Sequence, residues 1–224
     1  MKYLNNWKQI NESDENQQVE ETPSRSGRIL TQAQREWKDD SSIERDEVLP
    51  SVLFTDVEGS SEKWSNDPIT MMGQLKGHHD LVDRISKKYN GWIVKTIGDA
   101  FMIYFDPAVD SLTNAIKCGK EIILSEENYN LRVGVCQGPM QEDTYKLQKV
   151  NLRDFYGNSI NVASRMESKV AGAAGYIAFT SLEPISRNII SGYSKTIGQV
   201  SDVDLNKFDL KGAKTESAYR IKVK

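Results

Sequence analysis

Short apolar runs alternate with stretches of helical periodicity from residue 50 onward. The run SVLFTDV at 51–57 is short, apolar and partly β-branched, which predicts a buried strand. The segment 67–91 carries apolar residues near helical spacing and ends in an Asn-Gly pair that favours a left-handed stop, so it predicts a helix. The segment WIVKTIGDAFMIYF at 92–105 predicts two strands that turn at a central Gly-Asp pair and form a β-hairpin.

Further helices and strands alternate along the rest of the chain. The predicted helices cover about 108–125, 156–170 and 181–190, and the predicted strands cover 132–138, 175–180, 207–212 and 217–223. The polar segment at 139–153 predicts a connection without regular structure. This order of elements predicts the α+β fold class, with helices packed against one sheet.

The chain changes character near Leu49 and Pro50. Residues 1–48 hold 7 Lys and Arg against 11 Asp and Glu, are rich in Gln, Asn and Ser, and have too few apolar residues for a core. This composition predicts a polar, disordered tail. The segment 28–40 could form a short helix, but isolated helices of this length are unstable in water. We therefore predict one folded domain at 49–224, preceded by a tail through which an unidentified regulator could act.

Composition narrows the possible functions. The chain has 224 residues, 38% of them hydrophobic, and is long enough to bury a core. Its formal net charge of −3 argues against a nucleic-acid partner, which would need a basic face. Cys118 and Cys136 stand in unrelated contexts, so they indicate neither a metal pair nor a disulfide framework, and they fit a reducing compartment. No membrane-spanning segment and no signal peptide are recognisable, so we expect a cytoplasmic protein.

Two aspartates stand at the ends of apolar segments. Asp56 ends the first predicted strand in FTDVEGSS, and Asp99 lies at the tip of the predicted hairpin. If that strand and that hairpin are neighbours in one sheet, the two carboxylates converge and repel each other. Divalent cations such as Mg²⁺ or Mn²⁺ would neutralise them and keep positions for phosphate oxygens, which predicts a two-metal phosphoryl-transfer site. Considered alone, Asp56 could equally form an Asx turn or a helix cap.

Four sequence blocks carry a resemblance to a known family. They are FTDVEGSS, KTIGDAFM, RVGVCQG and DFYGNSINVASRMES, in this order. Together they resemble the catalytic domain of class III nucleotidyl cyclases, the adenylate and guanylate cyclases, over residues 50–224. The resemblance implies a ferredoxin-like βαββαβ core that is active as a homodimer, with its sites at the subunit interface. It also implies conversion of a nucleoside triphosphate to a 3′,5′-cyclic nucleotide and pyrophosphate.

The resemblance also implies a set of binding residues. Asp56, Asp99 and the main-chain carbonyl of Val57 match the ligands of two divalent cations, Mg²⁺ or Mn²⁺. Lys95 and Asp154 match the pair that recognises adenine in adenylate cyclases. Their chemistry suits adenine, because its N6 amino group can donate to a carboxylate and its N1 atom can accept from an ammonium group. The resemblance therefore favours ATP as the substrate and cyclic AMP as the product.

Asn161 and Arg165 match the transition-state pair of the family. They are four residues apart on a predicted helix and so share one face. Asn161 would orient the ribose, and the guanidinium of Arg165 would meet the charge that develops on the α-phosphate. Lys211 matches a lysine that contacts the terminal phosphates. The implied reaction is a metal-assisted attack of the ribose 3′-hydroxyl on the α-phosphate, in which positioning and electrostatics supply the catalysis.

Two alternative functions remain open. The chain could be a cyclase that acts on GTP or a pyrimidine nucleotide, or it could be a non-catalytic nucleotide-binding regulatory subunit. The segment 139–153 lacks the glycine-rich run often seen in cyclases where the dimer contact forms, so the dimer geometry is open there. His78 and His79 are interpreted as structural, since no carboxylate with a Ser or Cys accompanies them.

Overall fold

The structure is a computed structural model that describes residues 48–224, except 109, 148–149, 212 and 214. The described residues belong to one compact unit, Glu47–Lys224. The predicted tail at 1–48, with its possible helix at 28–40, lies outside the described residues apart from Val48. Within the described part, the α+β fold class is confirmed.

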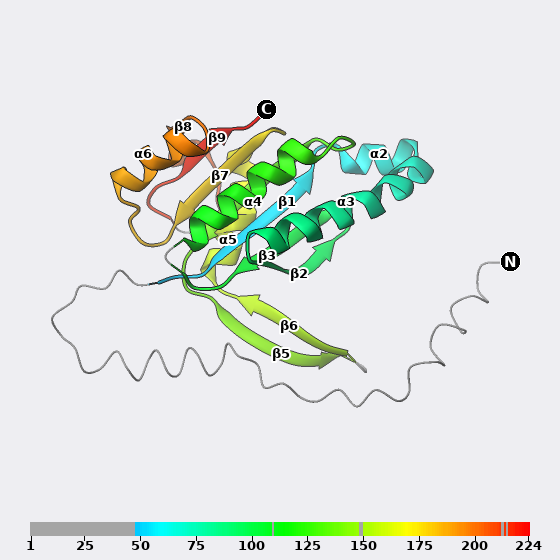
Figure 1. Cartoon of the computed structure of the whole chain (residues 1–224), viewed down its shortest axis with the longest axis horizontal. Helices are drawn as coiled ribbons and strands as arrows, with labels where there is room; N and C mark the ends of the chain where they lie inside the picture. Colours follow the sequence, from blue (N-terminus) through cyan, green and yellow to red (C-terminus); the bar gives the residue numbers. More distant parts are fainter. Residues whose placement is uncertain (1–47, 109, 148–149, 212, 214) are drawn as a thin grey trace, which may run out of the picture. The chain divides into compact units, whose positions relative to one another are not determined.

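One mixed sheet organises the described residues (Figure 1). In spatial order its strands are β2 (Gly91–Ile97), β3 (Ala100–Phe105), β1 (Ser51–Val57), β4 (Leu131–Gln137), β7 (Tyr176–Ser181), β9 (Tyr219–Lys222) and β8 (Val200–Asp202). Strands β1 to β4, with helices α3 (Pro68–Lys88) and α4 (Ser111–Ser125), form the predicted ferredoxin-like βαββαβ core. Strand β1 pairs antiparallel with both β3 and β4, so the expected contact between the first strand and the hairpin is confirmed.

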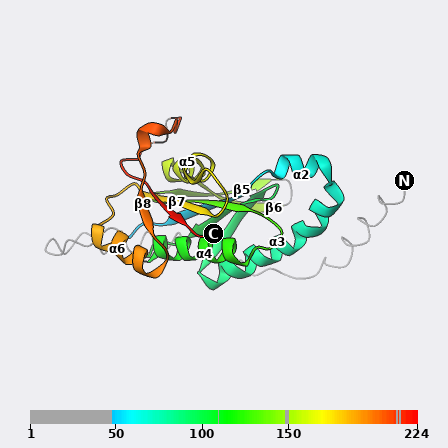
Figure 2. The same cartoon turned by 90° about the horizontal axis from the view of Figure 1, so that it is seen from above.

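Helices cover both faces of the sheet (Figure 2). Helices α3, α4 and α6 (Arg187–Thr196) lie on one face, and α5 (Asn158–Arg165), which continues as a π-helical segment, Met166–Ala171, lies on the other. Each face of the sheet buries its own hydrophobic core: the first core lies under α3 and α4, and the second lies under α5. Side chains alternate along β1, so Leu53 packs into the first core and Val52 into the second. Since both faces of the central strands are buried, polar side chains reach solvent mainly at strand ends, at turns and on the edge strand β2.

Strand β4 and helix α5 come closest at Gly134. A Cβ atom at this position would lie 2.1 Å from the backbone nitrogen of Glu167 and 2.3 Å from the carbonyl oxygen of Ala163. Only glycine leaves room for these main-chain atoms. The contact therefore fixes α5 and the π-helical segment directly on the sheet.

A second, two-stranded sheet replaces the irregular segment predicted at 139–153, so that prediction was wrong. Strands β5 (Gln141–Leu147) and β6 (Val150–Tyr156) pair antiparallel as a hairpin, which Figure 1 shows below the main sheet. In the described part of the chain this hairpin shares no strand pairing with the main sheet, and several of its side chains are exposed. Without two buried faces, its sequence carries no apolar run from which strands could be predicted.

The predicted helix at 181–190 begins six residues too early. Ser181 still belongs to β7, and α6 begins at Arg187. Ser186 is the N-cap, and its hydroxyl oxygen accepts a hydrogen bond from the backbone nitrogen of Ile189. The capping serine, rather than the first polar residue after the strand, sets the start of this helix.

The strand predicted at 207–212 does not form in the described residues. A short 3₁₀ turn occupies Leu205–Lys207, and the nearby strand is β8. Phe208 and Leu210 are partly buried against the second core without strand pairing. Their alternating apolar pattern reflects a loop that packs on the core.

The long predicted helix at 67–91 is confirmed as α3, which follows a short helix, α2 (Ser60–Asn66). Among the apolar residues of α3, Val82 and Ile85 are fully buried. Ile69 and Met72 instead face solvent, with 85% and 62% of their surface exposed. None of the helices in the described ranges has an apolar stretch long enough to cross a membrane.

Candidate functional site

The two predicted metal-binding aspartates lie at the same end of the sheet, Asp56 on β1 and Asp99 in the turn that leads into the neighbouring strand β3. The last pair between β1 and β3 joins Thr55 and Phe101, so Asp56 lies one residue beyond this pair and Asp99 two residues before Phe101. Asp99 occupies the two-residue turn between β2 and β3, in which Gly98 has a φ of 65°. A positive φ favours glycine, so the Gly-Asp pair builds the turn that presents the carboxylate.

Asp99 is a buried carboxylate with an unpaired oxygen. Only 7% of the residue is exposed, and its Oδ2 atom has no hydrogen-bond partner within the described ranges. An ionised oxygen buried without a partner is costly, so this atom fits ligation of a hard cation. Val57 ends β1 beside Asp56 and has its side chain in the core. In the part of the chain that the structure describes, no three His, Cys, Asp or Glu side chains are grouped to hold a metal, so a cation would depend on two aspartates and main-chain oxygen.

Arg132 joins Asp56 to Glu167. It stands directly opposite Asp56 across the β1–β4 pair, and its Nη2 atom lies 2.6 Å from Oδ2 of Asp56. Its Nε atom donates to Oε1 of Glu167, in the π-helical segment, at 2.5 Å. Burial alone would lower the pKa of Arg132, but the two carboxylates raise it above its ordinary value. Burial also raises the pKa of Glu167, to about 7, although Arg132 opposes this shift.

The two predicted base-recognition residues contact each other. The Nζ atom of Lys95, on β2, donates to Oδ2 of Asp154, on β6, at 2.6 Å. The other carboxylate oxygen of Asp154 accepts from the backbone nitrogen of Phe155 at 2.8 Å. The side chain of Asp154 is only 10% exposed, whereas that of Lys95 is 42% exposed. A cationic donor and an anionic acceptor are therefore presented side by side at the contact between the two sheets.

Side-chain contacts hold the β5–β6 hairpin against the main sheet. Phe155 stacks on Tyr104 of β3 with ring centroids 3.9 Å apart. The guanidinium of Arg153 lies over the ring of Trp92 of β2, 4.4 Å from its centroid, and is paired with Glu142. These contacts on either side of Asp154 position it beside Lys95.

The predicted transition-state pair and the predicted phosphate lysine line one hollow. Asn161, Arg165 and Lys211 surround a cavity of about 290 Å³ together with Ser164. Lys211 has a left-handed φ of 45°, and its backbone nitrogen donates to Oδ1 of Asp209 at 3.0 Å. This turn brings Lys211 to the helix that carries the other two residues.

The structure thus groups the predicted residues into three sets. Asp56, Val57 and Asp99 share a sheet end, Lys95 contacts Asp154, and the remaining three line the hollow. Sequence reasoning missed Arg132 and Glu167. The signal was available, because an arginine at the second position of a mostly apolar strand, LRVGVCQ, needs an anionic partner.

The two histidines lie against the core, with His78 buried and His79 partly buried. The Nδ1 atom of His78 lies 2.6 Å from Oε2 of Glu126, and both side chains are almost completely buried. The rings of His78 and His79 both pack edge-on against Phe101. Glu126 therefore binds His78 inside the core, which is consistent with a structural interpretation of this histidine.

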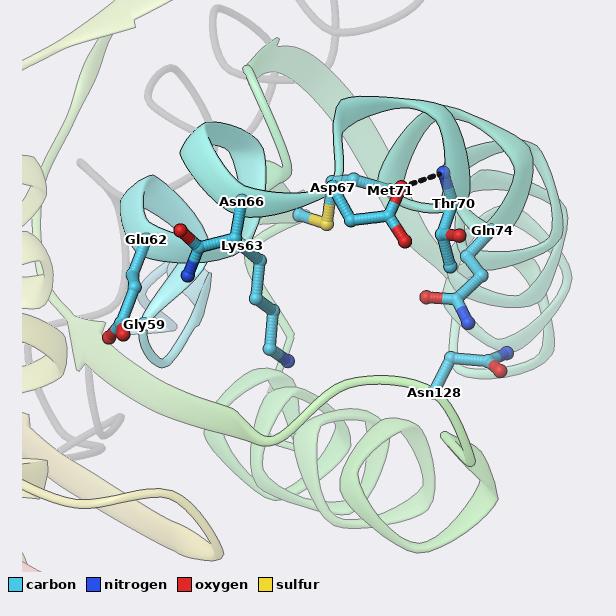
Figure 3. A pocket seen from close by; sticks show the side chains of 9 residues that line it. All are labelled: Gly59, Glu62, Lys63, Asn66, Asp67, Thr70, Met71, Gln74 and Asn128. Carbon is cyan, nitrogen blue, oxygen red and sulfur yellow. Dashed lines mark hydrogen bonds between the residues drawn. The ribbon is translucent and has the colours of Figure 1, made fainter.

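A larger hollow of about 380 Å³ lies between α2, the start of α3 and the loop at Asn128. Figure 3 shows Lys63 and Gln74 extending into this space from the two helices. Asp67 caps α3 by accepting from the backbone nitrogen of Thr70 at 3.0 Å, as the dashed line in Figure 3 marks. None of the predicted site residues lines this hollow, so it is separate from the three sets.

Comparison with known proteins identifies relatives of this sequence. A family model of the adenylate and guanylate cyclase catalytic domain matches residues 43–222. An adenylate cyclase of Podospora anserina is 27% identical over 166 residues, which are 63% of this chain and 8% of that protein. An adenylate cyclase of Schizosaccharomyces pombe is 29% identical over 165 residues, which are 60% of this chain and 10% of that protein. The chain thus spans a small part of these curated relatives.

Solved structures share the fold. The guanylate cyclase domain of RhGC from Catenaria anguillulae, in complex with GTP, has a TM-score of 0.62 and 24% identity, over 79% of this chain and 98% of that chain. An adenylate cyclase of Trypanosoma brucei in its monomeric state has a TM-score of 0.61 and 21% identity, over 80% of this chain and 90% of that chain. Because the family model spans most of the sequence and the fold agrees, the chain belongs to the adenylate and guanylate cyclase catalytic domain family.

Proposed function

We propose that this chain is an adenylate cyclase that converts ATP to 3′,5′-cyclic AMP and pyrophosphate. The observation that carries the proposal is the contact between Lys95 and Asp154, at 2.6 Å. Adenine needs an acceptor for its N6 amino group and a donor to its N1 atom, and this pair supplies one of each. Guanine presents the opposite pattern, so the same pair would leave polar groups of a guanine base unpaired.

The metal-binding end would consist of Asp56, Asp99 and the carbonyl of Val57. The unpaired, buried Oδ2 atom of Asp99 supports this assignment, because it needs a countercharge. Two divalent cations, Mg²⁺ or Mn²⁺, would make the 3′-hydroxyl a better nucleophile and neutralise the phosphates when bound.

The residues of the smaller hollow would position the reacting groups. Asn161 orients the ribose, Arg165 meets the charge on the α-phosphate with two parallel donors, and Lys211 binds the terminal phosphates. The bond from the 3′-oxygen to the α-phosphorus forms as the bond to pyrophosphate breaks. No histidine serves as general base in this scheme, since His78 is held by Glu126 inside the core.

We propose that the active unit is a homodimer with shared sites. Several large apolar side chains near the predicted site residues are exposed: Ile97 beside the Asp99 turn, and Tyr145 and Tyr156 on the hairpin that carries Asp154. Burying these side chains against a second copy would remove apolar surface from water.

The two cysteines bear on the cellular location. Cys118 and Cys136 are buried and form no disulfide in the described part of the chain, which is consistent with a cytoplasmic location.

The test is a product analysis with the full chain. The purified protein is incubated with each of the four nucleoside triphosphates and Mn²⁺, and the cyclic products are identified by mass spectrometry, with the Arg165→Ala variant as control. We expect cyclic AMP as the main product, and none from the control. A main product of cyclic GMP or a cyclic pyrimidine nucleotide would contradict the substrate assignment, and the absence of any cyclic product would favour a non-catalytic subunit.

A further inference from the structure

We propose that Arg132 is a counter-cation that occupies the carboxylate of Asp56 until a divalent cation displaces it, and that Glu167 is the positioning residue that retains the displaced guanidinium. The inference rests on the proposed metal-binding role of Asp56. It assigns functions to two residues that this role alone does not require.

The charges at this end of the sheet motivate the proposal. Asp56, Asp99 and Glu167 supply three formal negative charges, and Arg132 supplies one positive charge. With Glu167 ionised, the remaining formal charge of −2 equals the charge that the first divalent cation to bind would balance. Before a cation binds, the contact of 2.6 Å between Nη2 of Arg132 and Oδ2 of Asp56 lowers the repulsion between the carboxylates. A cation that ligates the same oxygen must therefore compete with Arg132.

The geometry lets one contact break while the other remains. Nη2 donates to Asp56 and Nε donates to Glu167, so the two ion pairs use different nitrogen atoms of one rigid fork. Glu167 is only 8% exposed, and its backbone nitrogen lies 2.1 Å from the position that a Cβ atom on Gly134 would take. Since Arg132 and Gly134 are on the same strand, Glu167 is fixed relative to the arginine that it holds. Arg132 can then turn away from Asp56 without becoming an unpaired, half-buried charge.

The test measures Mn²⁺ binding by isothermal titration calorimetry without nucleotide. The pH is kept above the pKa of Glu167, so that this carboxylate is ionised. We expect Arg132→Gln to tighten Mn²⁺ binding and Glu167→Gln to weaken it, each by about tenfold, which is a common size for coupling between two binding events. Glu167→Gln leaves Arg132 with Asp56 as its one remaining carboxylate partner in the described ranges. Arg187→Gln, on the exposed surface of α6, is the matched control for loss of an arginine charge and should leave the affinity unchanged.

A second measurement uses the unmodified chain and so does not depend on whether the variants fold. The Nε–H signal of Arg132 in a nitrogen-15 NMR spectrum should persist when Mg²⁺ is added, because the contact with Glu167 remains. Loss of that signal, or an equal Mn²⁺ affinity in Arg132→Gln and the unmodified chain, would overturn the inference. Failure of the proposed cyclase activity is distinguishable, since it would appear in the product analysis while the opposite shifts in Mn²⁺ affinity remained.

Discussion

Lys95 and Asp154 are 59 residues apart in the sequence, yet their side chains form an ion pair of 2.6 Å between two different sheets. In the proposed site, a nucleotide base must insert into a pair that is already satisfied. Separating the pair costs free energy. A base with a matching donor and acceptor offsets this cost by hydrogen-bonding to both side chains, and another base does not.

The first prediction concerns base selection by this pair. Lys95→Glu combined with Asp154→Cys should lose most ATP turnover and raise the activity on GTP relative to ATP, because the donor and acceptor types no longer match adenine. Steady-state kcat/KM for both nucleotides is the measurement. Lys88→Ala, which removes another exposed lysine paired with a carboxylate, Glu121, is the control and should keep the ATP preference. A double variant that still prefers ATP would show that these residues do not read the base.

The second prediction concerns the two aspartates. Asp56→Ala and Asp99→Ala should each abolish cyclase activity at saturating Mn²⁺ while the chain stays folded. Asp99→Ala removes a buried carboxylate whose Oδ2 atom has no hydrogen-bond partner among the described residues, so no loss of unfolding free energy is expected. Asp56→Ala removes one partner of a partly exposed ion pair, which costs about 1 kcal/mol or less. Urea unfolding without metal checks the stabilities, and near-normal turnover in either variant would contradict the metal assignment.

The third prediction concerns the shared sites of the proposed homodimer. Each chain would supply the metal-binding aspartates to one site and Lys95, Asp154, Asn161 and Arg165 to the other. Mixing the inactive variants Asp56→Ala and Arg165→Ala should then restore roughly a quarter of the normal activity, because about half of the dimers are mixed and each has one intact site. Subunit exchange is monitored by fluorescence energy transfer. Exchange without recovery would mean that each site is built within one chain.

The fourth prediction concerns the approach of strand β4 to helix α5. Gly134→Ala would place a Cβ atom 2.1 Å from the backbone nitrogen of Glu167, and backbone cannot move aside as a flexible side chain can. We expect a loss of about 3 kcal/mol in unfolding free energy, at the upper end of overpacking costs. Gly77→Ala is the matched control, since in the described part of the chain no heavy atom beyond its own helical turn lies within 4 Å of its Cβ position in α3. That change should stabilise the chain by about 0.5–1 kcal/mol, and equal effects of the two substitutions would contradict the packing.

The fifth prediction concerns the buried pair of His78 and Glu126. Glu126→Ala should lower the unfolding free energy by about 3 kcal/mol, because it leaves the Nδ1 atom of His78 unpaired inside the core. Asp83→Ala breaks an exposed pair with Lys87 and should cost about 0.5 kcal/mol or less. Both are measured by urea unfolding. A small effect at Glu126 would mean that this pair does not stabilise the fold.

The α+β fold class was predictable because most of the core strands are buried on both faces and therefore read as apolar runs, whereas the ferredoxin-like arrangement was implied by the family resemblance. Strands β1, β3 and β4 are of this kind, and the Gly-Asp turn before β3 adds a second signal. The placement of Asp56 near Asp99 followed from those elements. The roles of the candidate residues came from sequence blocks, and they stay predictions.

Other features depended on contacts that the sequence pattern does not display. The β5–β6 hairpin lacks an apolar run, and Phe208 and Leu210 pack on the core from a loop. The bridge through Arg132 depends on cross-strand register, which places Asp56 opposite it, and on the approach of Glu167 from the π-helical segment. Neither partner is adjacent in sequence, so the arginine alone gave no indication of what it binds.

The attachment of the β5–β6 hairpin has an evolutionary consequence. Among the described residues, its strands pair with each other and meet the main sheet through side chains such as Phe155 on Tyr104 and Arg153 on Trp92. No strand pairing of the main core would therefore be lost if this hairpin tilted. Substitutions among these aromatic residues can re-aim Asp154 without altering the pairing of β1 with its neighbours. In the proposed site, base selection can therefore change while the strand pairing of the main sheet stays intact, since different contacts position Asp154 and join those strands.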